Sequence, residues 1–293
     1  MQTLEALSAR MHTTAEIHSI VRTMKSLSSV SIRQYERAAA AMLQYERTVD
    51  LGLQAVLRDQ SLQPQVGSPA EVAPGSALIV IGSDRGLCGR FNDRIGGRAV
   101  ARILEESDCR LCVLGQRVAA HMEAEGHMPD ALFALPGSAA GLTATVHAVA
   151  VEIDRWTEAG VGTVSLLFNR RAGASLAVPT EWPLLPVPRG DLDALAREPW
   201  PSRSLPTYRM APTKLFSWLI GQRIFVQIYR ALAESLASEH AARLAAMRRA
   251  EGNISDHREE LMDAYRQKRQ EEITRELLDI ISGFEAVDQG DPA

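Results

Sequence analysis

Proline is missing from long stretches at both ends of the sequence, and this absence is its most informative feature. No proline occurs between Pro212 and Phe284, and none occurs before Pro64. Proline breaks helices because it lacks a backbone N–H and clashes with the preceding turn. Both stretches carry apolar residues at steps of three and four, which indicates one long amphipathic helix at each end. About 70 residues of helix extend roughly 100 Å, so no globular core can bury the C-terminal helix along its length.

The apolar stripes predict that the two helices pack against each other. If the segment between them is compact, the chain returns and the helices pair as an antiparallel coiled coil. The predicted N-terminal stripe includes Leu7, Ile17, Ile20, Met24 and Leu27. Polar residues fall at or near the seam, so we expect a pairing that is loose, strained or completed by other chains; these residues are Thr14, Ser28, Ser31, His240 and Lys268.

One-sided charge and long apolar runs are also absent. The net charge is -4, and between Arg243 and Glu276 eight basic residues are matched by eight acidic ones. A nucleic-acid-binding surface needs an excess of basic residues, so no nucleic-acid partner is expected. No stretch approaches the roughly 20 continuous apolar residues that cross a bilayer. Glu5 and Glu16 do not fit an organelle presequence, and we expect a bacterial cytoplasmic chain.

Cysteine is scarce, and three residues cannot all pair with one another. Cys109 and Cys112 form Cys-x-x-Cys, a spacing found in redox pairs and in halves of zinc sites. The motif leads into the apolar run 111–114, which predicts a buried strand, whereas a redox pair usually opens a helix. His121 and His127 could complete a zinc site only by a coincidence of spacing. We therefore expect structural cysteines, no metal site and no bound cofactor.

The middle of the chain changes its period. Short β-rich runs alternate with helical segments, with strands expected at 77–81, 111–114 and 163–168 and helices at 92–106, 116–126 and 142–159. This alternation predicts a Rossmann-like, three-layer α/β domain with a mainly parallel sheet. Residues 179–212 hold eight of the fourteen prolines, which indicates an edge strand followed by an extended surface loop. The predicted segments are an N-terminal coiled-coil helix (1–60), an α/β domain (76–206) and a C-terminal coiled-coil helix (211–287).

A glycine-rich segment follows the first predicted strand and runs from Gly82 to Asn92. Dinucleotide-binding proteins place their phosphate loop here, but these glycines are spaced Gly-x-x-x-Gly-x-x-Gly rather than Gly-x-Gly-x-x-Gly. The sequence also has no Gly-x-x-x-x-Gly-Lys-Ser/Thr motif. We favour a tight turn that exposes Asp84 and Arg85 to a partner over a nucleotide site. The histidines are scattered, and no catalytic residue is predicted.

Two segments resemble a known family. The first, Ser83-Asp-Arg-Gly-Leu-Cys-Gly-Arg-Phe-Asn92, resembles the signature loop of the gamma subunit of F-type ATP synthases. Residues 237–247, followed by Asn253 and by residues 269–277, resemble that subunit's C-terminal signature. Their order and spacing and the chain length agree over essentially the whole sequence. Within the loop, the matching positions are Asp84, Arg85, Gly86, Cys88 and Gly89.

The resemblance implies a rotor shaft that is not itself an enzyme. In the family, the terminal helices form an asymmetric coiled coil inside a ring of three alpha and three beta subunits. The α/β domain protrudes and sits with the epsilon subunit on the membrane ring of c subunits. Rotation of the shaft drives the three catalytic sites through successive states. The implied location is the cytoplasmic side of the bacterial inner membrane, to which the chain is bound only peripherally through the complex.

The resemblance also implies partner contacts, residue by residue. Arg269 and Gln270 match positions that hydrogen-bond a beta-subunit loop, with Thr274 nearby. Met24 and Arg243 match positions where the N-terminal helix faces the C-terminal helix and the ring. For each of these residues, a solvated helix face is the alternative interpretation.

The N-terminal motif differs from the family's pattern. The usual Lys-Ile-Thr-x-Ala-Met reads Ser-Ile-Val-Arg-Thr-Met at residues 19–24, and the usual Tyr-Glu-Pro reads Met-Ala-Pro at residues 210–212. These differences leave open a divergent, alternative F-type (N-type) ATPase that pumps sodium or works mainly in hydrolysis. Two other functions stay open, a nucleotide-binding α/β enzyme and a coiled-coil adaptor without a rotary partner.

Overall fold

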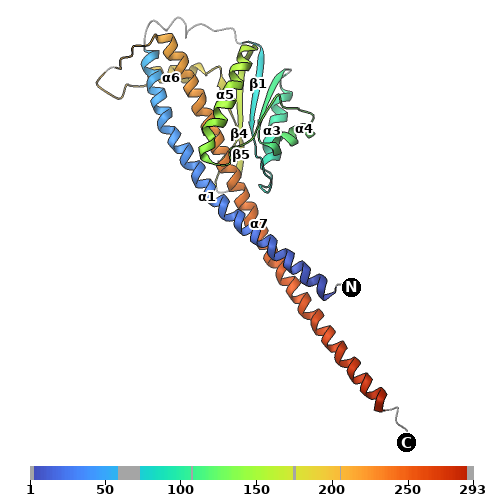
Figure 1. Ribbon diagram of the computed structural model, residues 1–293. Coiled ribbons are helices and arrows are strands. Elements are labelled where there is room, and N and C mark those ends of the chain that lie inside the picture. The colour runs from blue at the N-terminus through green and yellow to red at the C-terminus, as the bar shows by residue number, and fades with distance from the viewer. Residues whose placement is uncertain (1–2, 59–72, 107, 174–175, 205, 289–293) are drawn as a thin grey trace. The chain divides into compact units, whose positions relative to one another are not determined.

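The computed structural model describes residues 3–58, 73–106, 108–173, 176–204 and 206–288. The chain divides into two compact units. The central unit comprises residues 28–245, and the helical unit comprises residues 1–27 together with 246–293. Two helices, α1 (Leu4–Leu57) and α7 (Pro212–Asp288), each contribute to both units (Figure 1). Residues 1–2 and 59–60 of the predicted N-terminal segment lie outside the described residues.

A five-stranded mixed sheet forms the middle of the central unit. Its strands are β1 (Gly75–Ile81), β2 (Cys109–Leu114), β3 (Ala131–Phe133), β4 (Val161–Ala172) and β5 (Leu176–Leu185). The order is β3-β2-β1-β4-β5, with β5 antiparallel to β4 and all other neighbours parallel. Ile79 of β1 lies opposite Cys112 of β2 and Leu166 of β4. The predicted mainly parallel sheet with an edge strand is therefore confirmed.

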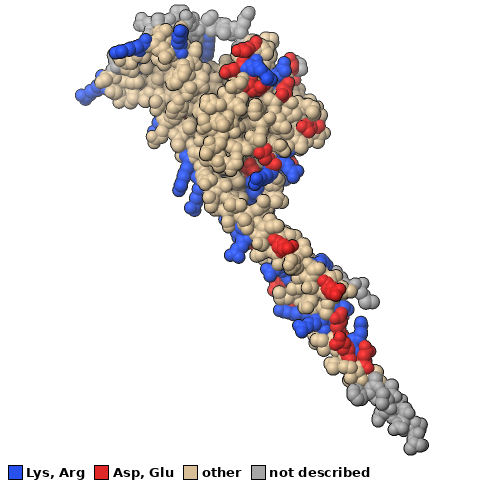
Figure 2. Space-filling view, viewed as in Figure 1, with Lys and Arg blue, Asp and Glu red and all other residues tan. Residues whose placement is uncertain are grey.

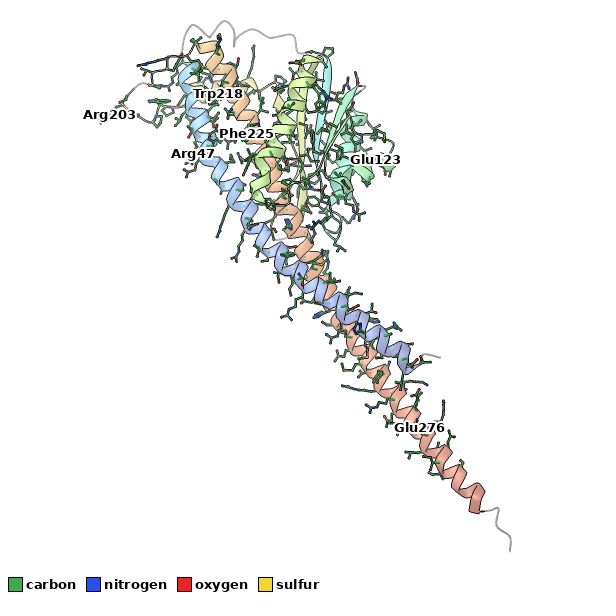
Figure 3. All side chains as sticks on the ribbon, in the orientation of Figure 1. Arg47, Glu123, Arg203, Trp218, Phe225 and Glu276 are labelled. Atoms are coloured by element: carbon green, nitrogen blue, oxygen red, sulfur yellow. The ribbon has the colours of Figure 1, made fainter. Side chains whose placement is uncertain are left out.

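Helices cover both faces of this sheet, which gives three layers (Figure 1). Leu78 and Val80 pack under α3 (Phe91–Leu104) and α4 (Gln116–Ala124). Their neighbour Ile79 points to the opposite face, toward α5 (Leu142–Glu158) and the part of α7 in the central unit. Phe225 of α7 lies beside α5, with its ring 5.1 Å from the ring of His147 (Figure 3). The continuous apolar run of β1 thus reflects burial on both faces.

The two cysteines of the Cys-x-x-Cys motif lie on β2 and belong to opposite faces of the sheet. Cys112 is fully buried with Ile79 in the layer under α5. Cys109 packs against the layer under α3 and α4. Side chains three residues apart on a strand point in opposite directions. These two thiols therefore cannot bind one metal ion together or form a disulfide with each other.

Strand β3 and helix α6 (Arg189–Arg197) of the central unit were not predicted from the sequence. Strand β3 has only three residues, too few for a period of two to show. The predicted extended loop at 179–212 is wrong in part, because it contains the helix α6. This short helix follows Pro188, carries Asp191 in its first turn and buries Leu192. The prolines on either side of this segment favoured an extended loop, so the helix was not predicted.

Within the central unit, α1 and α7 pair in antiparallel fashion. Glu46 on α1 accepts a hydrogen bond from Arg230 on α7 at 2.6 Å, and Asp50 accepts one from Arg223 at 2.6 Å. The residue numbers rise along α1 as they fall along α7, which fixes the direction. Leu53 and neighbouring apolar side chains of α1 pack with those of α7 in a separate small core.

The helical unit is a second antiparallel pairing of the same two helices. Lys25 on α1 donates hydrogen bonds of 2.6 and 2.8 Å to Glu251 on α7. The partly or fully buried side chains of α1 in this unit recur at steps of three and four, with one extra at position 24; they are Leu4, Leu7, Met11, Thr14, His18, Val21, Met24 and Lys25. Acidic and basic side chains are interspersed along the described surface of the unit (Figure 2).

The predicted apolar stripe of α1 needs a correction in the helical unit. Ile17, Ile20 and Leu27 are 46%, 58% and 63% exposed, so they do not lie in the seam. Thr14 occupies the seam instead, as the polar seam positions had indicated. The other two named residues of the predicted stripe, Leu7 and Met24, do lie among the covered side chains.

Candidate functional site

The glycine-rich segment forms a compact loop between β1 and α3, and its ends are held by the sheet. The N–H of Gly82 donates to the carbonyl of Leu114 at 2.8 Å. Asp84 accepts backbone N–H groups with both carboxylate oxygens, from Gln116 at 3.0 Å and from Leu135 at 2.9 Å. Gln116 is the first residue of α4, so this carboxylate also complements the positive end of the helix dipole.

These contacts correct the expected exposure of Asp84. Its side chain is half-buried and engaged with the backbone of its own chain, whereas Arg85 is exposed as expected. Asp84 therefore ties the loop to α4 and to the segment that follows β3. Arg85 is the residue of this pair that a partner could reach.

A second set of bonds closes the loop on itself. The N–H of Ser83 donates to Oδ1 of Asn92 at 3.1 Å, and Nδ2 of Asn92 donates to Oγ of Ser83 at 2.8 Å. Cys88 is buried at 3% exposure and packs with Phe91 and Ala177, and burial raises the pKa of its thiol. The loop is thus a folded turn whose interior is filled by its own side chains.

The loop backbone is strained at Leu87. Leu87 has a φ of 63°, in the left-handed region that favours glycine, while its side chain is 61% exposed. Gly89 adopts a similar φ of 62°, which glycine reaches without a steric penalty. A bulky residue holds such a conformation only when its surroundings enforce it. The residues on either side of Leu87 are held by contacts within the loop and by contacts with α7.

Arg243 of α7 grips the middle of the loop. Its guanidinium donates to the carbonyl of Arg85 at 3.3 Å and to that of Gly86 at 3.3 and 3.4 Å. It also donates to Oε1 of Glu239 at 2.5 Å and contacts Nδ1 of His240 at 3.3 Å. The side chain of Arg243 is only 7% exposed, so most of it is enclosed by its own chain.

The groups around Arg243 are electrostatically coupled. Burial raises the pKa of Glu239, and Arg243 partly offsets that effect. Burial, together with the positive charges of Arg243 and Arg85, lowers the pKa of His240 to about 4. His240 is therefore neutral near pH 7, and its Nδ1 can accept a hydrogen bond from the guanidinium. Its ring stacks on Tyr35 of α1, with 5.7 Å between the ring centroids.

A small pocket of about 150 Å³ lies beside this cluster. Its charged lining residues are Asp84, Glu239, Arg85 and Arg243, two of each sign. A phosphate site needs a surplus of positive charge or free backbone N–H groups at a helix start. Here the charges balance, and the first turn of the following helix α3 carries Asp93. The geometry therefore favours a structural turn over a nucleotide site.

The positions matched on the two long helices lie in the helical unit, apart from Arg243. Arg269 and Gln270 are exposed on α7, and Thr274 donates its hydroxyl back to the carbonyl of Gln270 at 2.8 Å. Met24 is half-buried on α1. Contacts of these four residues with a partner chain stay predictions, as does the contact expected between Met24 and Arg243.

Sequence reasoning missed Glu239 and Tyr35 and treated His240 only as a seam residue. One signal was available, because Glu239 and Arg243 stand four residues apart on a helix face otherwise rich in alanine and serine. Residues at this spacing are neighbours on a helix. What the sequence could not show is that the signature loop folds over the pair and buries it.

Comparison with known proteins places the whole chain in one family. The model of the ATP synthase family matches residues 3–287. The ATP synthase gamma chain of Granulibacter bethesdensis is 30% identical over 306 residues, which cover 98% of this chain and 100% of the relative. The chain belongs to the ATP synthase gamma chain family. The gamma chain of Bdellovibrio bacteriovorus is 29% identical and is covered over 99% of its length.

Solved structures share the gamma-chain fold. A chain in the Euglena gracilis mitochondrial ATP synthase (OSCP/F1/c-ring, rotational state 3) superposes with a TM-score of 0.67 at 18% identity, covering 99% of this chain and 96% of that one. A chain in the central stalk and c-ring of the Tetrahymena thermophila mitochondrial ATP synthase gives 0.54 at 25% identity, covering 79% and 99%. The two long terminal helices and the mixed sheet are thus features of this gamma-chain fold.

Proposed function

We propose that this chain is the central-stalk gamma subunit, the rotor shaft, of an F-type ATP synthase. It couples ion passage through a membrane ring of c subunits to ATP synthesis or hydrolysis in a ring of three alpha and three beta subunits. The observation that carries the proposal is the pair of long antiparallel helices, together with a family match that spans residues 3–287.

The free end of α7 supports a role inside a sleeve. Beyond the stretch that pairs with α1, α7 continues alone, and Glu276 lies on this part (Figure 3). Its apolar side chains are about half exposed; they are Ile273 (48%), Leu277 (55%), Leu278 (57%), Ile280 (56%) and Ile281 (53%). Contiguous exposed apolar side chains mark a surface that a partner covers. The alpha and beta ring is the partner that the proposed function supplies.

The helical unit also has the charge pattern that a turning shaft needs. Acidic and basic side chains are interspersed along it, and its ion pairs include exposed ones such as Arg266 with Asp263 at 3.4 Å. Exposed ion pairs contribute only about 0–1 kcal/mol each. Such a surface binds no single orientation of the surrounding ring strongly, so the shaft can pass from one position to the next.

We expect the chain itself to hydrolyse nothing. The loop after β1, where a nucleotide would bind, is filled by the side chains of Ser83 and Asn92 and gripped by Arg243. The epsilon subunit and the ring of c subunits complete the expected partners. None of the described helices is long and apolar enough to span a membrane. We place the chain peripherally on the cytoplasmic side of a bacterial plasma membrane, held there by the complex.

Reconstitution tests the proposal. The purified chain alone should show no ATPase activity, and mixing it with the alpha and beta subunits of the same organism should give a complex with one copy per hexamer. Mass photometry measures the stoichiometry, and a coupled assay measures phosphate release. Hydrolysis by the chain alone that is abolished by changes at Asp84 or Arg85 would contradict the proposal. A stable chain that ignores alpha and beta subunits would also contradict it and would favour an adaptor.

A further inference from the structure

The geometry points to Arg243 as a positioning residue that clamps the signature loop, defined as residues 83–92, to α7. Through this clamp the loop moves with the shaft helix rather than with a partner that it touches. The effect of this clamp on coupling rests on the proposed function. The clamp itself is a property of the isolated chain.

The middle of the loop takes hydrogen bonds from α7 in addition to the bond of 2.9 Å that the Ser83 hydroxyl donates to the carbonyl of Arg85. The start of the loop is held to β2 through the N–H of Gly82 and to α4 through Asp84, and Asn92 bonds Ser83 and so joins the two ends of the loop. The carbonyls of Arg85 and Gly86 point instead at the guanidinium of Arg243. Because Arg243 bonds backbone carbonyls, it fixes the path of the chain and leaves the Arg85 side chain free and exposed.

The clamp sits where the loop backbone is strained. Leu87, with a φ of 63°, directly follows the two carbonyls that Arg243 holds. On its other side, Cys88 is buried among Phe91 and Ala177, and Ala242 of α7 packs against the same cluster. The strained residue is thus fixed on both sides by contacts that include α7. Loss of the Arg243 hydrogen bonds on one side, or of the Cys88 packing on the other, would let Leu87 relax to a negative φ and move its exposed side chain.

Only arginine has the donors that this clamp uses. A planar guanidinium has five N–H donors, whereas a lysine ammonium presents three from a single atom. Arg243 uses its donors on two carbonyls, the Glu239 carboxylate and His240 Nδ1. Lysine at this position could keep the ion pair with Glu239 but could not also span both carbonyls.

The same turn of α7 braces two further segments. His240 stacks on Tyr35 of α1, and the hydroxyl of Tyr35 donates to the carbonyl of Pro136 at 3.2 Å. One turn of α7 therefore contacts the signature loop directly through Arg243 and contacts α1 through the ring of Tyr35. Through the Tyr35 hydroxyl it is also linked to the segment after β3. A force applied to the loop passes to the shaft helix through packed and hydrogen-bonded groups rather than through a flexible linker.

The thiol of Cys88 provides a direct test in the isolated full-length chain. The side chain of Cys88 is buried in the interior of the loop, so its maleimide labelling rate, resolved by peptide mass spectrometry, reports how often the loop opens. We expect Arg243→Lys to raise the Cys88 rate by about tenfold while the labelling of Cys112 in β2 stays unchanged. Arg248→Lys, at an exposed position of α7, serves as the matched control and should leave both rates unchanged.

A neutral double variant distinguishes loss of the clamp from a general loss of folding. Glu239→Gln with Arg243→Met removes the clamp without leaving a buried charge unpaired, and it should also speed Cys88 labelling. Circular dichroism and the Cys112 rate confirm that each variant is folded. Equal Cys88 labelling rates in the wild-type chain, Arg243→Lys and the double variant would overturn the clamp.

The second measurement uses the assembled complex in vesicles. We expect Arg243→Lys to lower the number of ions pumped per ATP hydrolysed by about twofold or more, with Arg248→Lys at the wild-type ratio. An unchanged ratio beside faster Cys88 labelling would overturn the role in coupling. Failure of the wild-type chain to assemble would contradict the proposed function instead, and the labelling result would still decide whether the clamp exists.

Discussion

Arg243 and Glu239 form a buried ion pair one helical turn apart on α7, with side chains only 7% and 6% exposed. Two backbone carbonyls of the signature loop accept hydrogen bonds from Nε and Nη2 of the same guanidinium. A buried charge is tolerated only when it is paired and hydrogen-bonded. The loop and the ion pair therefore depend on each other.

Breaking this pair from one side should destabilise the protein strongly. Arg243→Ala leaves the buried Glu239 carboxylate without its partner, and we expect the free energy of unfolding to fall by about 3–5 kcal/mol. Arg171→Ala is the control, because Arg171 and Glu36 form an ion pair with side chains 38% and 47% exposed, and it should cost about 0–1 kcal/mol. Urea denaturation of the full chain measures both. Similar losses in the two variants would show that burial of the Arg243 pair has no energetic consequence.

The buried imidazole of His240 predicts a pH dependence. Its folded-state pKa of about 4 lies below the unfolded value of 6.5, so the unfolded chain binds the proton first as pH falls. The stability from the neutral ring is fully present above about pH 6.5 and is lost as pH falls toward 4, by up to about 3 kcal/mol. Glu239, whose pKa is raised by burial, acts in the opposite sense. The other charged or titratable groups around the ring are Asp84, Arg85, Arg243 and the Tyr35 hydroxyl.

Denaturation at several pH values measures this effect. His240→Gln should flatten the dependence between pH 6.5 and 4, whereas His12→Gln, at an exposed position of α1, should leave it as in the wild-type chain. An equally steep loss of stability in His240→Gln would assign the dependence to other groups.

The long helices and the sheet follow from the sequence because their signals are local and extended. A proline-free run with a period of three and four residues predicts α7, and short β-rich runs between helical segments predict β1, β2 and β4. Strand β3 was not predicted because three residues are too few to show a period. Helix α6 was not predicted because prolines flank it on both sides. The seam of α1 was misread at Ile17, Ile20 and Leu27, since a sequence shows which side chains are apolar but not which stripe a neighbour covers.

The site was predictable in position but not in its interactions. The glycine spacing located the loop after β1, and Arg85 is exposed as expected. The engagement of Asp84 and the grip of Arg243 depend on tertiary contacts over distances of 32 to 158 residues along the chain. No local pattern encodes such pairings.

Two adjacent glycines of α3 should respond oppositely to alanine. A Cβ at Gly96 would lie 2.1 Å from Cδ2 of His121 on α4, whereas a Cβ at Gly97 would meet nothing within 4 Å. Gly96→Ala should therefore destabilise by about 1–3 kcal/mol through overpacking. Gly97→Ala should stabilise by about 0.5–1 kcal/mol through helix propensity. Thermal denaturation compares them, and a stabilised Gly96→Ala variant would show that His121 moves aside freely.

Replacement of the exposed residues Arg269 and Gln270 distinguishes an effect on partner binding from an effect on folding. Both side chains are exposed in the isolated chain, so replacing both with alanine should leave its melting temperature within the scatter of the wild type. If they hydrogen-bond a beta-subunit loop, with contributions of about 1–3 kcal/mol each, the double variant should lower coupled turnover in the assembled complex. Arg258→Ala, at another exposed position of α7, controls for loss of surface charge. A lower melting temperature with unchanged turnover would mean that these residues stabilise the helix and do not bind the ring.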